Sequence, residues 1–270
     1  MNLIYSCVFT NENYITLFKK LLTSYCRYND TSNACYLVIT SEDFREKIMS
    51  ILSESGLEHY DIWTLDVCTN PSKDYNVYES TYTRYFLFNY PKLHKFEKIL
   101  YLDCDILIVN NIDSLFSLEL ENKFYFVHEP MDRYNHCALF NDSEYENLDS
   151  ECTFTTAIIL FENTPTNTSN LEKFYDFVKK LHMNYINPLP AYDQPVVNKV
   201  CIEEKIYDNV LLRNYCLNIM PTDGVEKINL IPKYTMCHFA TNVGEHTSKL
   251  QRISTVQKVL NIPIDEKDKH

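Results

Sequence analysis

Glycine is scarce in this sequence, which has only 3 glycines among 270 residues. The phosphate-binding loops of many nucleotide-binding proteins need several glycines, in the pattern GxGxxG or in GxxxxGK followed by Ser or Thr, because the backbone must approach the phosphate closely. Neither pattern occurs in the chain. A nucleotide-binding function would therefore require a different way of holding the phosphates.

The chain also lacks an excess of positive charge. It has 25 Lys and Arg residues against 37 Asp and Glu residues, and its formal net charge is −12. Because nucleic-acid-binding proteins normally present a basic face, no nucleic-acid partner is expected. An anionic substrate stays compatible with this charge, since a bound metal ion can reverse the local electric field.

Closely spaced cysteine pairs are absent, although the chain has 10 cysteines. Structural zinc sites need such pairs, so we expect buried free thiols in a reducing compartment. The N-terminal segment has no basic, apolar leader, and no apolar run is long enough to cross a membrane. These features predict a cytoplasmic protein. The abundance of Asn, Lys, Ile and Tyr suits an AT-rich genome, and for a virus the compartment would be the host-cell cytoplasm.

Strand and helix patterns alternate in the first part of the chain. Apolar strands are expected at 3–9, 34–40 and 60–65, an amphipathic helix at 13–28, and a second helix after the potential cap Ser41. This alternation predicts an α/β fold with a mostly parallel central sheet flanked by helices.

The rest of the chain is less regular. We expect helices at 79–90, 169–185, 248–260 and from Asp193, strands at 98–102, 124–127, 156–161 and 234–239, and a long loop at 129–151. No repeat or linker divides the sequence. One domain is therefore predicted over residues 1–262, with a flexible tail at 263–270.

Two acidic residues, Asp103 and Asp105, directly follow the apolar strand expected at 98–102. In open α/β sheets, ligands bind just beyond the carboxyl ends of the strands, and acids placed there are costly unless something pairs with them. A turn can aim both carboxylates at one divalent cation, which in turn binds nucleotide phosphates. The pattern predicts a metal site, and a solvated acidic turn is the alternative.

A second candidate ligand is His238, in the apolar strand expected at 234–239. Manganese accepts an imidazole nitrogen beside carboxylates more readily than magnesium does. A lone histidine is more often a packed core or surface residue, so the residue type alone leaves both interpretations open.

Several segments resemble the motifs of glycosyltransferase family 8, the retaining group that includes glycogenin and bacterial lipopolysaccharide galactosyl- and glucosyltransferases. They are Phe9-Thr-Asn-Glu-Asn-Tyr14, Thr81-Tyr-Thr-Arg84-Tyr, Lys98-Ile-Leu-Tyr-Leu-Asp-Cys-Asp-Ile-Leu, Asn111-Ile-Asp-Ser-Leu-Phe116, Asp193-Gln194 with Asn198, and Met236-Cys-His238-Phe. The resemblance covers residues 3–250 in the family's order. It implies a single-domain GT-A fold, a UDP-sugar donor and Mn²⁺, with Mg²⁺ as the alternative cation.

Carried onto this chain, the resemblance implies roles for individual residues. The nucleotide-sugar would be bound by Phe9, Thr10, Asn11, Tyr14, Arg84, Asp103, Cys104, Thr155, Thr156, Gly244 and Lys249. The metal ligands would be Asp103, Asp105 and His238. Catalytic roles would fall to Arg84 at the diphosphate or donor sugar, and to Asp193 and Gln194 along that sugar. The alternative interpretations are an exposed helix charge for Arg84 and a helix cap for Asp193.

Two segments depart from the family pattern. Thr155-Thr156-Ala157 follows Phe154 where the family usually has Asn, then Ser or Ala, then Gly, and this leaves the identity of the sugar open. The late His-x-x-Gly-x-x-Lys-Pro-Trp motif is missing. After His238 a longer segment carries Gly244 and Lys249, which are the candidates for the phosphate-binding turn and lysine.

The predicted function is Mn²⁺-dependent transfer of a hexose of glucose or galactose type, with retention, from a UDP-sugar to a glycan or protein acceptor. Same-face attack is favoured over a covalent intermediate, for which Asp193 is the sequence's nucleophile candidate. A metal-dependent sugar nucleotidyltransferase and a non-catalytic nucleotide-sugar-binding relative are the alternatives. The acceptor, the linkage, self-glycosylation and assembly, a homodimer included, stay open.

Overall fold

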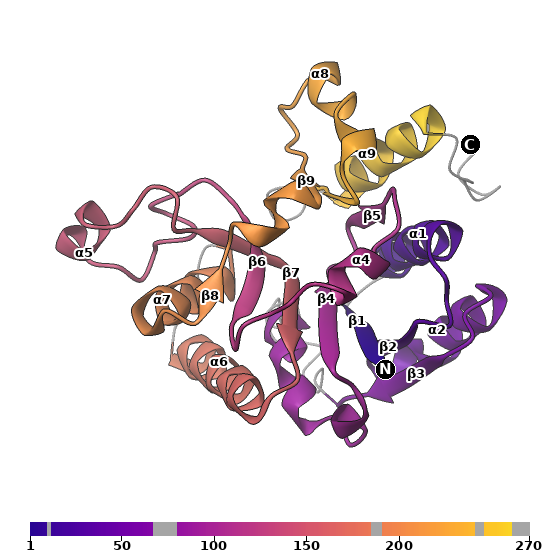
Figure 1. Ribbon diagram of the computed structural model, residues 1–270, viewed down its shortest axis with the longest axis horizontal. Helices are drawn as coiled ribbons and strands as arrows, with labels where there is room; N and C mark the ends of the chain where they lie inside the picture. The colour runs from indigo at the N-terminus through magenta and orange to yellow at the C-terminus, as the bar shows by residue number, and fades with distance from the viewer. Residues whose placement is uncertain (10–11, 67–79, 185–190, 241–245, 261–270) are drawn as a thin grey trace.

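A central β-sheet organises the computed structural model (Figure 1). The structure describes residues 1–9, 12–66, 80–184, 191–240 and 246–260. Within these ranges the central sheet has seven strands in the order β3-β2-β1-β4-β7-β6-β8. The strands are β1 (Asn2–Val8), β2 (Ala34–Thr40), β3 (Tyr60–Thr64), β4 (Lys98–Leu102), β6 (Phe124–His128), β7 (Phe154–Glu162) and β8 (Tyr207–Asp208).

Most neighbouring strands of this sheet are parallel. The pairs β3–β2, β2–β1, β1–β4 and β6–β8 are parallel, whereas β7 runs antiparallel to both β4 and β6. The reversal at β7 brings its amino end to the same edge of the sheet as the carboxyl ends of β1, β4 and β6. The predicted α/β fold with a mostly parallel central sheet is confirmed.

Helices cover both faces of the central sheet (Figure 1). The α-helices in the described ranges are α1 (Glu12–Tyr28), α2 (Glu42–Glu54), α4 (Asp113–Phe116), α5 (Asp142–Glu146), α6 (Pro165–Asn184), α7 (Gln194–Glu204), α8 (Val225–Ile228) and α9 (His246–Val259). Short 3-10 helices lie at η1 (Thr83–Asn89), η2 (Leu93–Lys95), η3 (Leu211–Asn214) and η4 (Ile231–Lys233).

Alternate residues of β1 pack into two different hydrophobic clusters. Ile4 belongs to the cluster that contains Leu17 of α1, and Tyr5 belongs to the cluster that contains Tyr85 of η1 and Phe174 of α6. Both faces of the strand are therefore buried, because successive side chains of a strand point to opposite faces. This explains why β1 carries apolar residues on both faces, with the buried Ser6 as an exception, instead of alternating with polar residues.

A second sheet in the described residues has three strands in the order β5-β10-β9. They are β5 (Ile106–Ile108), β9 (Cys216–Asn218) and β10 (Met236–His238). β10 pairs antiparallel with β5, which sets His238 opposite Ile106. The amide of Phe239 donates a hydrogen bond to the carbonyl oxygen of Asp105 at 3.1 Å. This small sheet carries the late histidine to the aspartates that follow β4.

The long helices and strands that the sequence predicts are confirmed, while their end residues and several short elements differ from the prediction. Residues 83–89 form a 3-10 helix instead of an α-helix, and Tyr90, which precedes a proline, is extended with ψ 121°. Gly56 takes the left-handed conformation expected after α2, with φ 82°. Ser41 occupies the cap position of α2, but its side chain makes no capping hydrogen bond.

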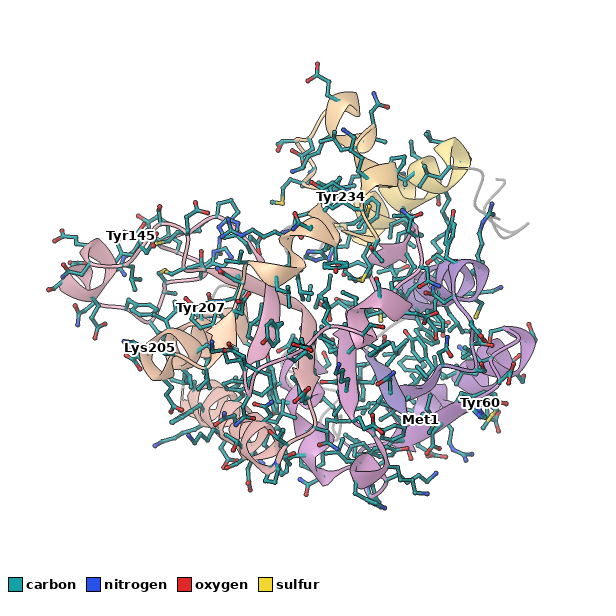
Figure 2. All side chains as sticks on the ribbon, viewed as in Figure 1. Met1, Tyr60, Tyr145, Lys205, Tyr207 and Tyr234 are labelled. Carbon is teal, nitrogen blue, oxygen red and sulfur yellow. The ribbon has the colours of Figure 1, made fainter. Side chains whose placement is uncertain are left out.

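The segment 129–151, expected as a loop, contains the short helix α5. Asn141 and Glu144 form a reciprocal capping box at its start. Five residues are too few to display a helical period, so hydrophobic patterning missed this helix. Figure 1 shows α5 on a segment that projects away from the central sheet, and Figure 2 shows Tyr145 on the same segment.

No helix of the described ranges is long and apolar enough to span a bilayer. The nine cysteines in these ranges are free thiols. The predicted tail at 263–270 and the domain boundary at residue 262 lie outside the described residues, so both stay predictions.

Candidate active site

A cavity of about 280 Å³ lies where β1, β4 and β6 end and β7 begins. Its lining is made by Cys7, Phe9, Tyr14, Ser80, Thr81, Arg84, Tyr101, Asp103, Cys104, Asp105, Glu129, Asn135, His136, Thr155, Thr156, Ala157, Ala191, Tyr192, Asp193, Gln194, Met220, His238, Ala240 and Lys249. Every predicted site residue in the described ranges is among them. Thr10, Asn11 and Gly244 lie outside those ranges.

A wider cavity of about 430 Å³ lies at the opposite, amino edge of the parallel strands, near Met1 and Tyr60 (Figure 2). Its principal acid, Asp61, already pairs with Lys92 at 2.6 Å and accepts a hydrogen bond from the Tyr90 hydroxyl at 2.5 Å. None of the predicted site residues lines it. The smaller cavity is therefore the candidate active site, since ligands of open α/β sheets bind at the carboxyl ends of the strands.

Asp103 is held by the guanidinium of Arg84 and the phenol of Tyr101. The Nη1 atom of Arg84 lies 3.4 Å from Oδ1 and 3.5 Å from Oδ2 of Asp103, and the Tyr101 hydroxyl donates a hydrogen bond to Oδ1. Burial raises the pKa of Asp103, Arg84 opposes that effect, and the charge of Asp105 adds to it. The pKa of this carboxyl is therefore raised overall, as expected for two acids in one turn.

Arg84 lies between two carboxylates and is only 6% exposed. Its Nε donates to the carbonyl of Thr81 at 2.7 Å and lies 3.8 Å from Oδ2 of Asp193, while Nη1 donates to the carbonyl of Thr156 at 2.8 Å. Burial would lower the pKa of the guanidinium, but Asp103 and Asp193 raise it. The interpretation of Arg84 as an exposed helix charge is wrong.

Asp105 faces two groups from distant parts of the chain. The Nζ atom of Lys249 lies 2.6 Å from its Oδ2, and Nε2 of His238 lies 3.8 Å from its Oδ1. Burial would raise the pKa of Asp105, but Lys249 and His238 lower it overall. Its Oδ1 is buried and has no hydrogen-bond partner. The alternative of a solvated acidic turn is wrong for Asp105, which is 7% exposed.

Cys104 points away from these acids. Its Sγ donates a weak hydrogen bond to the carbonyl of Cys7 at 3.4 Å, and its side chain packs in the core cluster of β1 and α1. Burial raises the pKa of the thiol well above its usual range. The buried side chain of Cys104 holds the turn in place. The carboxylates of Asp103 and Asp105, on either side of it in the sequence, both line the cavity.

His238 is oriented by an amide. Its Nδ1 lies 3.1 Å from Oδ1 of Asn218, while Nδ2 of Asn218 donates to the carbonyl of His128 at 3.2 Å. That second bond fixes the amide orientation, so Nδ1 of His238 must be the protonated nitrogen. In the neutral ring the lone pair is then on Nε2, the atom that faces Asp105. Such an outer hydrogen bond is typical of histidines that ligate metals.

The described residues contain no group of three or more His, Cys, Asp and Glu side chains already arranged around a single metal position. The ammonium of Lys249 instead lies against Asp105. A buried carboxylate oxygen without a partner and an imidazole lone pair nevertheless face each other. This donor chemistry fits a divalent cation, and manganese accepts such a mixture of oxygen and nitrogen.

Asp193 stands at the cap position of α7, but its side chain does not cap the helix. It accepts a hydrogen bond from the Tyr85 hydroxyl and lies near Arg84. The two preceding residues, Ala191 and Tyr192, have φ 53° and 54°, a left-handed conformation that is strained for residues other than glycine. Asp193 therefore occupies the predicted cap position of α7, while its carboxylate lies at the cavity instead of capping the helix.

Gln194 and Asn198 attach α7 to the start of β7. Oε1 of Gln194 accepts from the amide of Thr156 at 3.4 Å. Oδ1 of Asn198 accepts from the amide of Phe154 at 3.1 Å, and its Nδ2 donates to the carbonyl of the same residue at 3.0 Å. Thr155 and Thr156 are both 3% exposed, and these hydrogen bonds hold the start of β7 against α7.

Glu129 and His136 also line the cavity, and the sequence analysis missed both. Glu129 directly follows β6, just as Asp103 directly follows β4, so an acid after a strand was an available signal. Burial would raise the pKa of Glu129, but a hydrogen bond and charge from His136 lower it. His136 lies within the predicted loop, where nothing in the local pattern indicated that it returns to the sheet.

Comparison with solved structures defines the class of fold. Mouse xyloside xylosyltransferase 1, in its apo form, is similar with a TM-score of 0.60 at 13% identity, over 88% of this chain and 97% of that chain. A galactosyltransferase, LgtC, in complex with donor and acceptor sugar analogs, has a TM-score of 0.55 at 16% identity, over 98% of each chain. A glycosyltransferase involved in the glycosylation of the major capsid of PBCV-1 has a TM-score of 0.54 at 14% identity, over 94% of this chain and 98% of that chain. The fold is thus the GT-A fold of glycosyltransferases.

The family follows from the sequence. The family model described as glycosyl transferase family 8 matches residues 5–242, and the chain belongs to that family of glycosyltransferases. No curated protein matches the chain. The family resemblance of the sequence motifs is confirmed.

Proposed function

We propose that this glycosyltransferase moves a hexose, of glucose or galactose type, from a UDP-sugar to a glycan or protein acceptor with retention of configuration. The observation that carries the proposal is the convergence of Asp105, His238 and Lys249 with Asp103 and Arg84 on one cavity. A diphosphate needs cations, and this is the edge of the sheet where a ligand would lie.

The cation in this proposal is Mn²⁺, with Mg²⁺ as the alternative. Asp103, Asp105 and His238 would hold it through carboxylate oxygens and Nε2. When bound, the cation would neutralise charge on the diphosphate leaving group. The unpartnered Oδ1 of Asp105 and the amide-oriented ring of His238 support this set of ligands.

Two side chains of the protein would stabilise the leaving group directly. Arg84 is fixed by bonds to the carbonyls of Thr81 and Thr156, so its positive charge is oriented before substrate binds. Lys249 comes from α9 and reaches the same cavity. This position supports the identification of Lys249 as the substitute for the family's late lysine. With a cation held by Asp105, the ammonium of Lys249 would be free to contact the diphosphate.

The route with retention is a same-face attack by the acceptor hydroxyl. A covalent route requires a carboxylate nucleophile beside the sugar, and Asp193 is the candidate. Its carboxylate accepts a hydrogen bond from Tyr85 and lies beside Arg84, which reduces its nucleophilicity. On the same-face route the acceptor proton passes to the leaving phosphate oxygen, and Asp193 and Gln194 position the donor sugar.

A screen for UDP release tests the donor assignment. The purified protein is incubated with individual UDP-sugars, among them UDP-glucose and UDP-galactose, in Mn²⁺ or in EDTA. The proposal predicts UDP release from at least one of them in Mn²⁺ alone. Pyrophosphate made from UTP and a sugar phosphate would favour a nucleotidyltransferase. Tight binding of UDP-sugars with no release would favour a non-catalytic relative.

The acceptor, self-glycosylation and assembly as a homodimer stay open in this proposal. A cytoplasmic location, in the host cell for a viral chain, is likewise proposed from the free cysteines and from the absence of a membrane-spanning helix among the described residues.

A further inference from the structure

Arg252 lies about one turn after Lys249 on α9, the helix that brings the lysine to the candidate active site. Residues three apart on a helix are neighbours on the same side. The Nη1 atom of Arg252 donates a hydrogen bond to the carbonyl of Ile219 at 3.0 Å, and its Nη2 atom donates to the carbonyl of Ala240 at 3.0 Å. The planar fork of one guanidinium thus joins the first part of α9 to two other segments of the chain.

The two carbonyls lie where strands of the small sheet end. Ile219 directly follows β9, and Ala240 is the second residue after β10. The amide of Ile219 donates to the carbonyl of His238 at 2.8 Å. The guanidinium carbon of Arg252 lies 5.7 Å from the centre of the ring of Phe239, which is fully buried. Arg252 is therefore attached to the same small sheet that carries His238.

The small sheet is in turn fixed to the turn that carries the aspartates. Its strand β5 begins directly after Asp105 and pairs with β10. The amide of Phe239 donates to the carbonyl of Asp105 at 3.1 Å. The carboxylate of Asp105 meets the ammonium of Lys249 at 2.6 Å. Helix α9 is thus attached to this frame at two points, by Arg252 through backbone carbonyls and by Lys249 through the Asp105 carboxylate.

The rest of α9 packs on α1 (Figure 1). Ile253 and Val256 are buried in the hydrophobic cluster that α9 shares with α1, and Nζ of Lys20 donates to Oε1 of Gln257 at 3.4 Å. The hydrophobic effect is non-directional, whereas hydrogen bonds require defined distances and angles. The two bonds of Arg252 are therefore suited to fix the position of the start of α9 more sharply than apolar packing does.

Lys249 needs such a fixed starting point. A lysine side chain has a flexible four-carbon stem, so its ammonium can occupy many positions around one backbone position. In the proposed function this ammonium contacts the leaving diphosphate. A misplacement of about 1 Å at a reacting centre can slow a reaction about a hundredfold. A helix that is clamped close to the lysine limits that misplacement.

We infer that Arg252 is a positioning residue that aims the ammonium of Lys249 at the candidate active site by clamping α9 to the ends of β9 and β10. The inference rests on the proposed transferase function. The described residues that line the cavity do not include Arg252, so it acts through Lys249 and not by contact with the substrate. Without the clamp, the ammonium is less often beside Asp105 in the metal-free protein and less often beside the diphosphate during transfer.

A double-mutant cycle tests whether Arg252 acts through Lys249. The four proteins are the wild type, Arg252→Met, Lys249→Met and the double variant. Isothermal titration calorimetry measures the Kd for Mn²⁺ in the absence of nucleotide. UDP release from the preferred UDP-sugar in Mn²⁺ measures kcat and KM. Arg252→Lys keeps the charge but replaces the fork by a single ammonium, and Gln251→Met, at the exposed neighbouring position, is the matched control.

The inference predicts that Arg252→Met lowers kcat about tenfold, because the leaving group loses a well-oriented cation. The same change lowers the Kd for Mn²⁺ about threefold, because the ammonium of Lys249 competes less for Asp105. In the Lys249→Met background, adding Arg252→Met changes either quantity by less than about twofold. Arg252→Lys lies between the wild type and Arg252→Met, and Gln251→Met behaves as the wild type.

Two results would overturn the inference while leaving the proposed function intact. One is an unchanged kcat and Mn²⁺ affinity in Arg252→Met. The other is a change of the same size with and without Lys249, which would assign Arg252 to overall stability or to charge. Absence of UDP release from every UDP-sugar by the wild type would overturn the proposed function, and the Mn²⁺ cycle would then decide on the clamp alone. Thermal unfolding identifies a folding defect in Arg252→Met, in which case Arg252→Lys replaces it in the cycle.

Discussion

The ammonium nitrogen of Lys249 lies 2.6 Å from Oδ2 of Asp105, although the two residues are 144 positions apart in the sequence. Lys249 comes from α9, and Asp105 follows the central strand β4. The lysine is an internal counter-ion at the point where the proposed Mn²⁺ would bind. A cation that binds there in the absence of nucleotide must displace it.

Replacing Lys249 by methionine is therefore expected to strengthen Mn²⁺ binding to the nucleotide-free protein. Removal of a positive charge this close to a ligand oxygen should lower the Kd on the order of tenfold. Isothermal titration calorimetry measures the change. Lys258→Met is the control, since Lys258 is on the same helix and is exposed. An unchanged or weaker Mn²⁺ affinity in Lys249→Met would contradict the assignment of Asp105 as a ligand.

Arg84 connects the two halves of the site, and its replacement should affect both stability and activity. Arg84→Gln leaves Asp103 and Asp193 without their shared cation, and unpairing buried charges costs about 3–5 kcal/mol of unfolding free energy. Arg84→Lys keeps the charge but cannot span both carboxylates and the Thr156 carbonyl, because a lysine has no planar fork.

Urea unfolding measures the stability of the Arg84 variants, and UDP release measures their activity. We expect Arg84→Lys to be folded and to release UDP about a hundredfold more slowly. Arg45→Gln replaces an exposed arginine of α2 and is the control, with no expected effect. An Arg84→Lys variant as active as the wild type would show that the guanidinium has no role in the chemistry.

Asn198 should be one of the most sensitive polar residues of the fold. Its side chain bonds the amide and carbonyl of Phe154 and the carbonyl of Gln194, and it is fully buried. Asn198→Ala leaves these backbone groups unsatisfied, at about 2–4 kcal/mol of unfolding free energy. Urea unfolding checks this against Asn214→Ala, at an exposed position. A loss similar to that of the control would contradict the account.

Asp61 gives the fold a pH dependence away from the site. Burial would raise the pKa of Asp61, but Lys92 and the Tyr90 hydroxyl lower it overall. Its unfolded pKa is about 3.9, so the pairing stabilises the fold above that pH and is lost as the pH falls through the lower folded value. The side chain is 27% exposed, so the effect should be about 0.5–1 kcal/mol.

Asp61→Asn tests this pH dependence by urea unfolding at neutral pH and at decreasing acid pH. The wild type should be more stable than the variant at pH 7, and the difference should shrink below about pH 4. A difference that stays constant across the acid range would show that Asp61 acts through its shape or hydrogen bonds and not through its charge.

Strong local patterns predicted the part of the molecule where the nucleotide and the metal are proposed to bind. The apolar strand before Asp103 and the period of the helix after Phe9 each follow from neighbouring residues alone. The contacts of Arg84 with Asp193 were not visible, because two residues far apart in sequence meet through the packing of η1 against α7 and β7.

The position of His136 at the cavity could not be predicted for a related reason. His136 returns to the cavity through side-chain turns of Asp132 and Arg133, and such turns leave no hydrophobic period. Lys249 was identified only through the family resemblance. Its contact with Asp105 depends on where α9 packs, which no local sequence signal fixes.

The most direct test of the central claim is the rate of UDP release from the preferred UDP-sugar by the wild type and by Asp105→Asn, each in Mn²⁺ and in EDTA. Asn keeps the size of the side chain and removes the charge that the cation requires. The account predicts release by the wild type in Mn²⁺ alone, and a loss of at least about a hundredfold in the variant. Equal rates for the two proteins, or wild-type release that EDTA does not abolish, would contradict it.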